Sequence, residues 1–243
     1  MNSYLEAIAA IGGSSLHPGG FHHTLSTLRN FKISRDDIII DVGCGTGRTA
    51  CHLAKVYGAH VFALDNSTEM LAKARDRAQQ EKADVHFVHG DVLNMPFRDQ
   101  VADLIMIESV MVFLPALQGI KECFRVLKKG GLLVDIELFA KASLPAHGRE
   151  QMKAVCGLPG IPTFREWQQT FEAAGFSEVA AIWRNFPGPL EHLKEMFVGE
   201  FNPFFVLGAG IKAHHARALN DYRRIMRQYR RHFGFGTFIY RKA

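Results

Sequence analysis

The segment 41–47, which reads DVGCGTG, carries the residue types of this 243-residue chain that point most clearly to chemistry. It closes an apolar, β-branched run that begins at Ile38, and such a run is typical of a strand buried on both faces. Glycines directly after a strand let a ligand approach the backbone, because no Cβ stands in the way and a positive φ is accessible. In parallel α/β sheets such crevices lie at the carboxyl ends of the strands. The segment therefore predicts a ligand-binding loop.

An acidic residue also stands at the end of each of four predicted strands, namely Asp41, Asp65, Asp91 and Glu108. A dinucleotide-binding motif would need a glycine where this chain has Arg48, and such an enzyme explains only Asp65, as a ribose-binding acid. A nucleoside with a cationic amino-acid tail explains the whole row. Its hydroxyls, adenine amine, ammonium and sulfonium all favour acceptor or anionic groups around them.

The elements that must position these residues alternate between strands and helices. The predicted strands cover 38–42, 60–64, 85–88, 102–107 and 132–136, and the predicted helices cover 48–57, 66–78 and 117–127. Such alternation implies right-handed crossovers and a parallel sheet.

Helix ends and loops follow from local signals. Asn66 is expected to cap the second of these helices, with Glu69 reaching back to it. The basic, glycine-rich segment 128–131 is expected to end the third helix. The segment 139–162 is rich in Pro and Gly and is expected to be a long irregular loop.

The two ends of the chain complete the pattern. Two short helices are expected at 1–11 and 21–31. Thr163 and Glu166 form a second capping box, which opens a helix that buries Trp167 and Phe171. Two closing strands are expected at 179–183 and 236–240, with a helical, aromatic insertion between them.

With these motifs the chain resembles the class I methyltransferases, in particular the broad group of small-molecule enzymes that includes the ubiquinone-biosynthesis type. The resemblance covers about residues 35–140 and rests on DVGCGTG, on ALD ending at Asp65, on HGDV ending at Val92, on DLIMIES and on LKKGGLLV. It implies S-adenosylmethionine as cofactor and S-adenosylhomocysteine as its product. It also implies methyl transfer to an O, N or C atom of a small molecule.

The resemblance also implies roles for individual residues. The glycines of the loop would surround the methionine part of the cofactor, Asp65 would bind the ribose hydroxyls, and Asp91 and the Val92 amide would lie near the adenine. Glu108 and Ser109 would face the methionine and sulfonium region. The full set of expected cofactor-binding residues is Asp41, Gly43, Cys44, Gly45, Gly47, Asp65, Asn66, Met70, Asp91, Val92, Glu108 and Ser109.

Three of these residues have an alternative role. Met70 can be a plain core residue, Ser109 can cap the next turn, and Asp41 can orient the loop without touching a ligand.

The fold implied by the resemblance is a Rossmann-like α/β fold. Its doubly wound, seven-stranded sheet has an antiparallel last strand, with a helical insertion before that strand. One methyltransferase domain is expected over 1–243, with N-terminal helices in 1–34, a cofactor-binding core in 35–140, and a substrate-side part in 141–243 that contains the insertion at about 190–232.

Methyl transfer from a sulfonium is an in-line displacement, so much of its rate can come from holding the two reacting atoms in line. A general base is needed only where the nucleophile carries a proton of high pKa. The catalytic residue is therefore unknown, and the candidates are His17, His22 and His147, with His23, Glu108 and Glu137 as further ones. The segment 17–20, HPGG, is either a plain turn or the start of a helix that faces the cofactor's carboxylate.

The remaining features concern partners and compartment. The net charge is +5, and its excess around 216–232 is either a solvated helix face or a surface for an anionic partner. The cysteines form no C-x-x-C pair and have no zinc spacing, so we expect free thiols, no metal and a cytoplasmic protein. No apolar run approaches the ~20 residues that cross a bilayer, and no stable membrane insertion is expected.

The acceptor is not identified by the sequence. The residues after Glu108 lack the Pro-Pro-Tyr type of motif common in nucleic-acid amino-methylating enzymes, and no Pro-Cys dipeptide occurs, so nucleic acid is not expected as a substrate. Six apolar residues of the insertion, Phe197, Phe201, Phe204, Phe205, Val206 and Leu207, either roof a pocket or pack the insertion or a homodimer. A catalytically silent cofactor-binding protein and an NAD-dependent oxidoreductase remain the alternatives to a methyltransferase.

Overall fold

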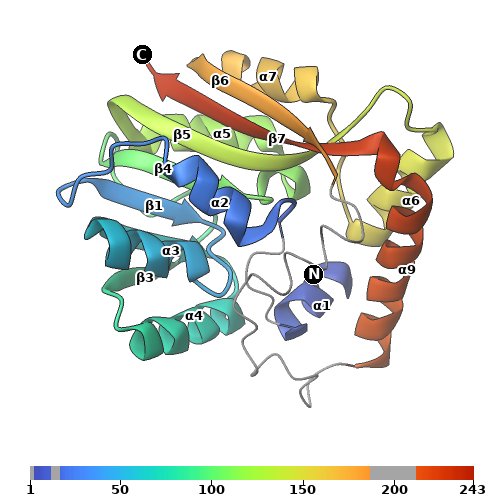
Figure 1. Ribbon diagram of the computed structural model, residues 1–243, viewed down its shortest axis with the longest axis horizontal. Helices are drawn as coiled ribbons and strands as arrows, with labels where there is room; N and C mark the ends of the chain where they lie inside the picture. Colours follow the sequence, from blue (N-terminus) through green and yellow to red (C-terminus); the bar gives the residue numbers. More distant parts are fainter. Residues whose placement is uncertain (1–2, 12–16, 187–211) are drawn as a thin grey trace.

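The computed structural model describes residues 3–11, 17–186 and 212–243, which surround one seven-stranded sheet (Figure 1). The strands are β1 (Ile38–Val42), β2 (His60–Asp65), β3 (Val85–His89), β4 (Ala102–Glu108), β5 (Leu127–Ala140), β6 (Phe176–Asn185) and β7 (Phe233–Lys242). Their order is β3-β2-β1-β4-β5-β7-β6. The pairs among β1 to β5 are parallel, and β7 is antiparallel to both of its neighbours. The expected sheet, with an antiparallel last strand, is confirmed.

Helices connect these strands. They are α1 (Ser3–Ile11), α2 (Gly20–Leu28), α3 (Arg48–His52) with its π-helical continuation η1 (Leu53–Tyr57), α4 (Thr68–Glu81), the 3₁₀ turn η2 (Met111–Phe113), α5 (Ala116–Val126), α6 (Ala146–Cys156), α7 (Phe164–Ala173), α9 (Ala213–Tyr229) and the 3₁₀ turn η3 (Arg230–His232). The last helix before β7 confirms the expected helical insertion within the described residues.

Each face of the sheet has its own core, because successive side chains of a strand point to opposite faces. Ile39 and Leu104 pack with residues of α2, α3 and η1. Their neighbours Ile40 and Ile105 pack with residues of α5 and α7 on the other face. This two-sided burial explains why the central strands read as continuous apolar runs.

The segment 139–162 corrects one expectation, since it contains α6. Pro145 and Gly157 do not interrupt this helix but bound it. Pro145 is its N-cap, and Gly157 ends it in the left-handed conformation with φ 68°. The prediction of an irregular loop was wrong because it counted the Pro and Gly residues without testing the apolar spacing of Met152 and Cys156 between them.

Two further local predictions were wrong. The segment 128–131 does not end α5, because the helix stops at Val126 and Leu127 is already extended, so β5 begins five residues earlier than expected. Ser67, rather than Asn66, caps α4 by accepting the Met70 amide, while Glu69 pairs with Lys73 instead of reaching back. The capping box of α7 is confirmed, with Thr163 and Glu166 exchanging both hydrogen bonds.

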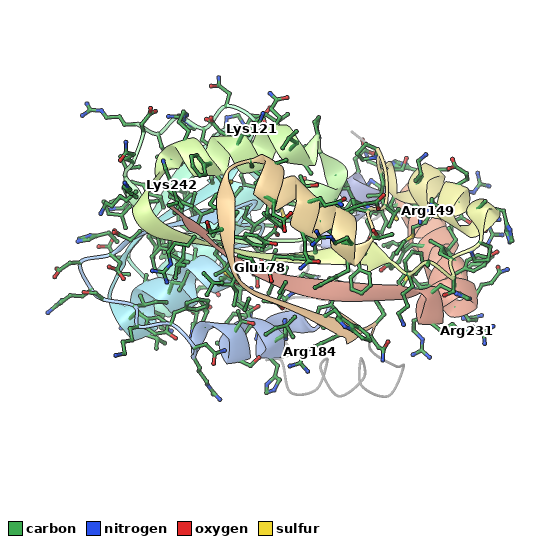
Figure 2. The ribbon with its side chains drawn as sticks, turned by 90° about the horizontal axis from the view of Figure 1, so that it is seen from above. Lys121, Arg149, Glu178, Arg184, Arg231 and Lys242 are labelled. Carbon is green, nitrogen blue, oxygen red and sulfur yellow. The ribbon has the colours of Figure 1, made fainter. Side chains whose placement is uncertain are left out.

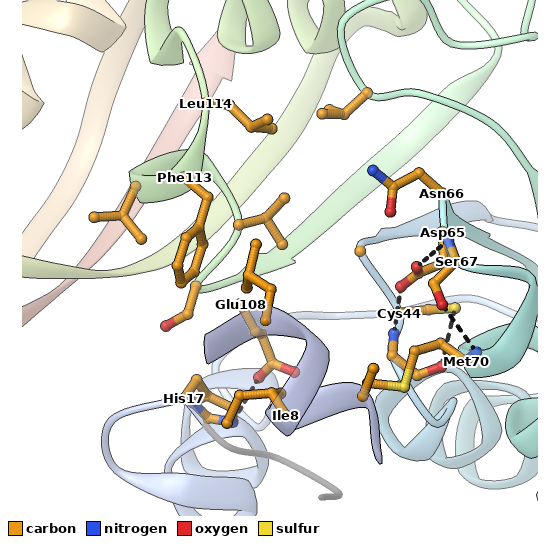
Figure 3. Close-up of a pocket in the computed structure, with 18 of the residues that line it drawn as sticks. Ile8, His17, Cys44, Asp65, Asn66, Ser67, Met70, Glu108, Phe113 and Leu114 are labelled. Carbon is orange, nitrogen blue, oxygen red and sulfur yellow. Dashed lines mark hydrogen bonds and ion pairs between the residues drawn. The ribbon is translucent and has the colours of Figure 1, made fainter. Parts of the chain in front are cut away.

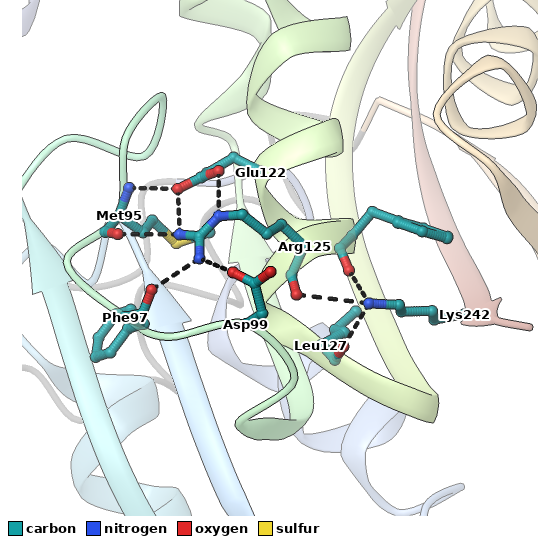
Figure 4. A network of polar contacts seen from close by, with 8 residues as sticks. Met95, Phe97, Asp99, Glu122, Arg125, Leu127 and Lys242 are labelled. Atoms are coloured by element: carbon teal, nitrogen blue, oxygen red, sulfur yellow. Dashed lines mark hydrogen bonds and ion pairs between the residues drawn. The ribbon is translucent and has the colours of Figure 1, made fainter.

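Arg125, on α5, holds the segment that connects β3 to β4 (Figure 4). Its guanidinium donates to Glu122, to Asp99 and to the backbone carbonyls of Met95 and Phe97. The Met95 amide in turn donates to Glu122, and Arg125 holds the pKa of the Glu122 carboxyl below its usual range. This network anchors the segment that carries Asp91 and Val92.

Charged side chains cover the outside of the molecule, as Figure 2 shows for Lys121, Arg184 and Arg231. On α9, Arg217, Arg223, Arg224 and Arg227 are exposed, while the opposite side of the helix is buried. The basic segment 216–232 therefore has a solvated face. Among the described residues, no helix has both the length and the hydrophobicity needed to span a bilayer.

The two tryptophans allow a matched test of the packing around α7. Trp167 is fully buried and donates its indole N–H to the Leu138 carbonyl at 2.9 Å, whereas Trp183 is 55% exposed. We expect Trp167→Phe to lower the free energy of unfolding by about 1–3 kcal/mol, because it leaves a cavity and removes a buried hydrogen bond. Trp183→Phe is the control and should change it by less than about 0.5 kcal/mol. Urea unfolding measures both, and equal effects would contradict the assigned packing.

Candidate functional site

A cavity of about 390 Å³ opens at the carboxyl ends of the parallel strands (Figure 3). Its volume lies within the roughly 300–1,000 Å³ that is usual for small-molecule sites. Of the residues expected at the cofactor, all except Asp41 and Gly47 line this cavity: Gly43, Cys44, Gly45, Asp65, Asn66, Met70, Asp91, Val92, Glu108 and Ser109.

The glycine-rich loop is held by the end of β2. The amides of Gly43 and Cys44 both donate to the Leu64 carbonyl, at 2.8 and 3.0 Å. Gly43 has φ 68°, and a Cβ there would lie 2.3 Å from Val110, so this position requires glycine. Gly45 differs, because a Cβ there would meet nothing within 4 Å. The space beside Gly45 is therefore free for a ligand.

Asp65 joins this loop to the start of α4. Its Oδ2 accepts the Gly45 amide and its Oδ1 accepts the Ser67 amide, both at 2.9 Å. Burial raises the pKa of the Asp65 carboxyl, and hydrogen bonds from the Ser67, Gly45 and Asn66 amides act in the opposite direction. Each carboxylate oxygen accepts about two hydrogen bonds, so the carboxylate retains capacity for a ligand hydroxyl.

Glu108, at the end of β4, is held by three side chains. The Thr24 hydroxyl donates to its Oε1, and the Thr49 hydroxyl donates to its Oε2 at 2.7 Å. His17 Nε2 lies 3.3 Å from Oε1. These three contacts fix the orientation of the carboxylate, so Glu108 presents a positioned acceptor group at the cavity.

His17 is brought to Glu108 by the turn at 17–20. Gly19, with φ 86°, is the N-cap of α2, and the turn leads directly into that helix. His17 Nδ1 lies 3.2 Å from the Pro18 carbonyl, while Nε2 faces the Thr24 hydroxyl and Glu108. Because the Thr24 hydroxyl donates its hydrogen to Glu108, its oxygen is an acceptor for His17, which places a ring hydrogen on Nε2.

The other base candidates lie elsewhere. His22 is exposed on α2, and exposed His147 packs its ring against Tyr229. His23 is buried and bonds Thr237 at 2.7 Å, and burial lowers its pKa to about 4. Glu137 is fully buried and does not line the cavity.

Asp41 and Gly47 support the loop from behind. Asp41 is 2% exposed and accepts the Ala50 amide, and burial raises its pKa well above the usual range. Gly47 is the N-cap of α3 with φ 74°, where a Cβ would lie 2.9 Å from the Cβ of Ala74. Both residues thus contribute to the shape of the loop and lie outside the cavity wall.

Glu137 fixes the turn that follows Glu108. Its Oε1 accepts the amides of Val110 and Met111, at 2.8 and 2.6 Å. In the same turn Ser109 has φ 57°, which is uncommon for a residue other than glycine. The buried Ser109 hydroxyl has no hydrogen-bond partner among the described residues, so it can serve a ligand in the cavity that it lines.

The cysteines of the chain are free thiols, of which Cys44 and Cys156 line the cavity. Burial raises the pKa of both thiols, that of Cys156 to about 12. Both are therefore protonated at neutral pH and are poor nucleophiles.

One group of possible metal ligands occurs in the described part of the chain. Donor atoms of Glu6, His214 and His215 lie within 4.8 Å of one another where α1 meets α9. His215 Nδ1 accepts the Lys212 amide, so its hydrogen lies on Nε2, which faces Glu6 at 4.0 Å. In this tautomer the Nε2–H points toward the Glu6 carboxylate, so Nε2 has no lone pair to offer a metal.

Sequence reasoning missed the apolar wall of the cavity. This wall includes Phe186 and residues of three helices, namely Tyr4 and Ile8 of α1, Met152 of α6 and Tyr222 of α9. Tyr4 and Ile8 stand at helical spacing, and this spacing predicts the apolar face of α1. The six apolar residues expected between 197 and 207 lie outside the described residues.

Comparisons with known proteins point to one family. A model described as a methyltransferase domain matches residues 39–131. The chain is 30% identical to the uncharacterized methyltransferase YodH of Bacillus subtilis (strain 168) over 182 residues, 75% of this chain and 78% of the relative. It is 31% identical to a demethylmenaquinone methyltransferase of Staphylococcus haemolyticus (strain JCSC1435) over 173 residues, 61% of this chain and 71% of the relative.

A solved structure of a Haemonchus contortus phosphoethanolamine N-methyltransferase 2, in complex with phosphomonomethylethanolamine and S-adenosylhomocysteine, has a similar fold. Its TM-score is 0.76 at 19% sequence identity, over 98% of this chain and 57% of that one. At this identity the likeness concerns the fold.

The buried carboxyls under the cavity predict a pH dependence of stability. Burial raises the pKa of both Asp135 and Glu137, so the folded chain keeps protons that the unfolded chain releases. Stability should therefore fall as pH rises from about 5 through neutrality. Glu137→Gln cannot ionise, and its amide oxygen can still accept the Val110 and Met111 amides, so the fall should become shallower.

Urea unfolding between pH 5 and pH 8 measures this slope for the wild type and for Glu137→Gln. Glu150→Gln, at an exposed carboxylate, is the matched control and should keep the wild-type slope. An unchanged slope in Glu137→Gln would contradict the raised pKa.

Proposed function

The chain belongs to the class I methyltransferases, and we propose that it transfers a methyl group from S-adenosylmethionine to a small molecule. The observation that carries the proposal is the row of acids Asp65, Asp91 and Glu108 along one cavity, beside a glycine-rich loop. This combination matches a nucleoside with a cationic amino-acid tail.

The residues of the cavity fit this cofactor in three respects. A Cβ at Gly45 would meet nothing within 4 Å, so the loop leaves room for a ligand against its backbone. The Ser109 hydroxyl lacks a partner among the described residues and can bond a polar group. Finally, Glu108 offers an anion opposite the positive charge that S-adenosylmethionine carries on sulfur.

Each end of the cofactor then has a proposed partner. Asp65 binds the ribose hydroxyls with the acceptor capacity that the backbone amides of Gly45, Asn66 and Ser67 leave on its carboxylate. Exposed Asp91 and the Val92 amide meet the adenine. Glu108 and Ser109 face the methionine and sulfonium region.

Bound S-adenosylmethionine supplies an electrophilic methyl group, and the chain's residues hold the acceptor in line with it. Glu108 Oε2 has one donor, Thr49, and so retains a free acceptor site for a proton or hydroxyl of the acceptor. His17 orients this carboxylate through Oε1. We propose the His17–Glu108 pair as the proton-accepting group where the acceptor atom carries a proton.

Asp65→Ala tests the ribose assignment. We expect the wild type to bind S-adenosylhomocysteine in calorimetry and NAD not at all, and we expect Asp65→Ala to weaken the first by on the order of 100-fold, since two charge-assisted hydrogen bonds are lost. Asp65 also supports the loop, so the 2′-deoxy analogue of S-adenosylhomocysteine is titrated as well. The wild type should prefer the natural ligand, and Asp65→Ala should lose this preference.

Asp84→Ala is the control, because this carboxylate is exposed at the opposite end of β3. Binding of NAD alone would overturn the proposed function. Retention of the 2′-hydroxyl preference in Asp65→Ala would assign the ribose to another residue.

Glu108→Gln tests the charge next to sulfur. S-adenosylmethionine carries one positive charge more than S-adenosylhomocysteine, so losing the carboxylate should weaken the first on the order of tenfold more than the second. Calorimetric titration of both ligands gives the ratio, and Asp65→Ala serves as a contrast, because it should weaken both ligands equally. An equal loss for both ligands in Glu108→Gln would place this residue away from the sulfonium.

A further inference from the structure

The cavity has a second half that the cofactor assignments do not use. Its wall comes from α1, α6, α9 and the segments that follow α6 and β6, through Tyr4, Met152, Leu158, Phe186 and Tyr222. Figure 1 shows α6 and α9 at the right of the view, away from α3 and α4, with α1 between α9 and α4. This half of the single cavity is built by elements outside the glycine-loop region.

The strand order separates the two halves. Along the edge of the sheet the carboxyl ends follow in the order β3, β2, β1, β4 and β5, which carry Asp91, Asp65, Gly43, Glu108 and Leu138. The acids and the glycine loop thus occupy the β3 to β1 side, and Leu138 marks the apolar side. Glu108 stands at the boundary, where a group in one half can meet a group in the other.

Charged groups are confined to one half. Among the described residues that line the cavity, the charged side chains are Arg48, Asp65, Asp91 and Glu108, and the His17 imidazole lies beside Glu108. None comes from α1, α6, α9 or β5. The Arg48 guanidinium lies 4.1 Å from the centre of the Phe21 ring, so this cation contacts a residue of α2.

The polar groups of the apolar half are neutral. Burial raises the pKa of Tyr4 and of Tyr222, and their rings pack at 5.0 Å between centroids. The Cys156 thiol, with a pKa of about 12 through burial, is also uncharged at neutral pH. The described wall therefore offers apolar surface, two phenol hydroxyls and a thiol, but no cation.

An anion placed here would lose its hydration without gaining a counter-charge, which is costly. An uncharged apolar molecule would gain from the burial of its surface. From this contrast we infer that the apolar half binds the methyl acceptor, and that the acceptor is an uncharged, largely apolar molecule rather than a phosphorylated or zwitterionic one. This inference rests on the proposed methyl transfer, which requires an acceptor beside the cofactor half.

The test uses two probes with the same ring system, 1-naphthol and 1-naphthyl phosphate. Each is titrated by calorimetry into the full chain saturated with S-adenosylhomocysteine. We expect 1-naphthol to bind about tenfold more tightly or better, because only the phosphate must be desolvated without a cation. Equal binding, tighter binding of the phosphate, or binding of neither probe would overturn the inference.

Leu158→Lys locates the site by a gain of binding, which misfolding cannot imitate. Leu158 is buried in the loop after α6 and lines the apolar half, so a lysine there supplies the missing cation. We expect this variant to reverse the preference toward 1-naphthyl phosphate while S-adenosylhomocysteine binds as before. Leu117→Lys is the control, because Leu117 is 41% exposed on α5, and it should leave the preference unchanged.

The two proposals fail in different ways. Loss of S-adenosylhomocysteine binding in the wild type would remove the proposed function itself. Normal binding of S-adenosylhomocysteine together with a preference for the phosphate probe, or an unaltered preference in Leu158→Lys, would remove only the inference about the acceptor.

Discussion

The Asp65 carboxylate connects three parts of the site, and the geometry of the cavity depends on it. It ends β2, accepts the Gly45 amide of the loop after β1, and accepts the Ser67 amide at the start of α4. Two neighbouring parallel strands end at the same edge of the sheet, so one short side chain can reach both. The positive φ of Gly43 and Gly45 turns the loop toward this carboxylate. Replacing those glycines by larger residues would strain the loop, because L residues rarely adopt this conformation.

A second constraint lies beneath the cavity, where carboxyl groups are buried with few partners. Asp41, Asp135 and Glu137 are almost fully buried, and burial raises the pKa of each. Buried carboxyls are costly, but Glu137 has an evident use. It holds the Val110 and Met111 amides and so fixes the turn that presents Glu108 and Ser109. Asp135 lies beside Glu137, and burial together with the Glu137 carboxyl raises the pKa of Asp135.

The sequence could predict the sheet and the cofactor half of the cavity because both rest on local signals. Apolar runs, glycine spacing and an acid at each strand end are visible without long-range information, and most of these residues line one cavity. Asn66 and Ser67 show the limit of such signals. Both residues can cap a helix, and the choice depends on Asp65, which already holds the Ser67 amide. The contacts of His17 with Glu108 and of Tyr4 with Tyr222 join distant segments, and no local pattern encodes them.

The cavity divides into a cofactor half and an apolar half because only the first has donors that hold charged side chains. The cofactor half contains acids that are held by backbone amides, hydroxyls and His17, so fixed charge there is supported by donors on the loop and on α2. The other half is bounded by helices that bring apolar side chains, and its hydroxyls and thiol stay protonated through burial. The hydrogen bonds of Glu108 come from the cofactor half. Its strand, β4, lies next to β5 in the sheet, so Glu108 also borders the apolar half. In the proposed transfer, the methyl group leaves a charged environment and arrives on a neutral one. This arrangement favours an acceptor that brings its reactive atom to Glu108 and buries the rest of its surface among α1, α6 and α9.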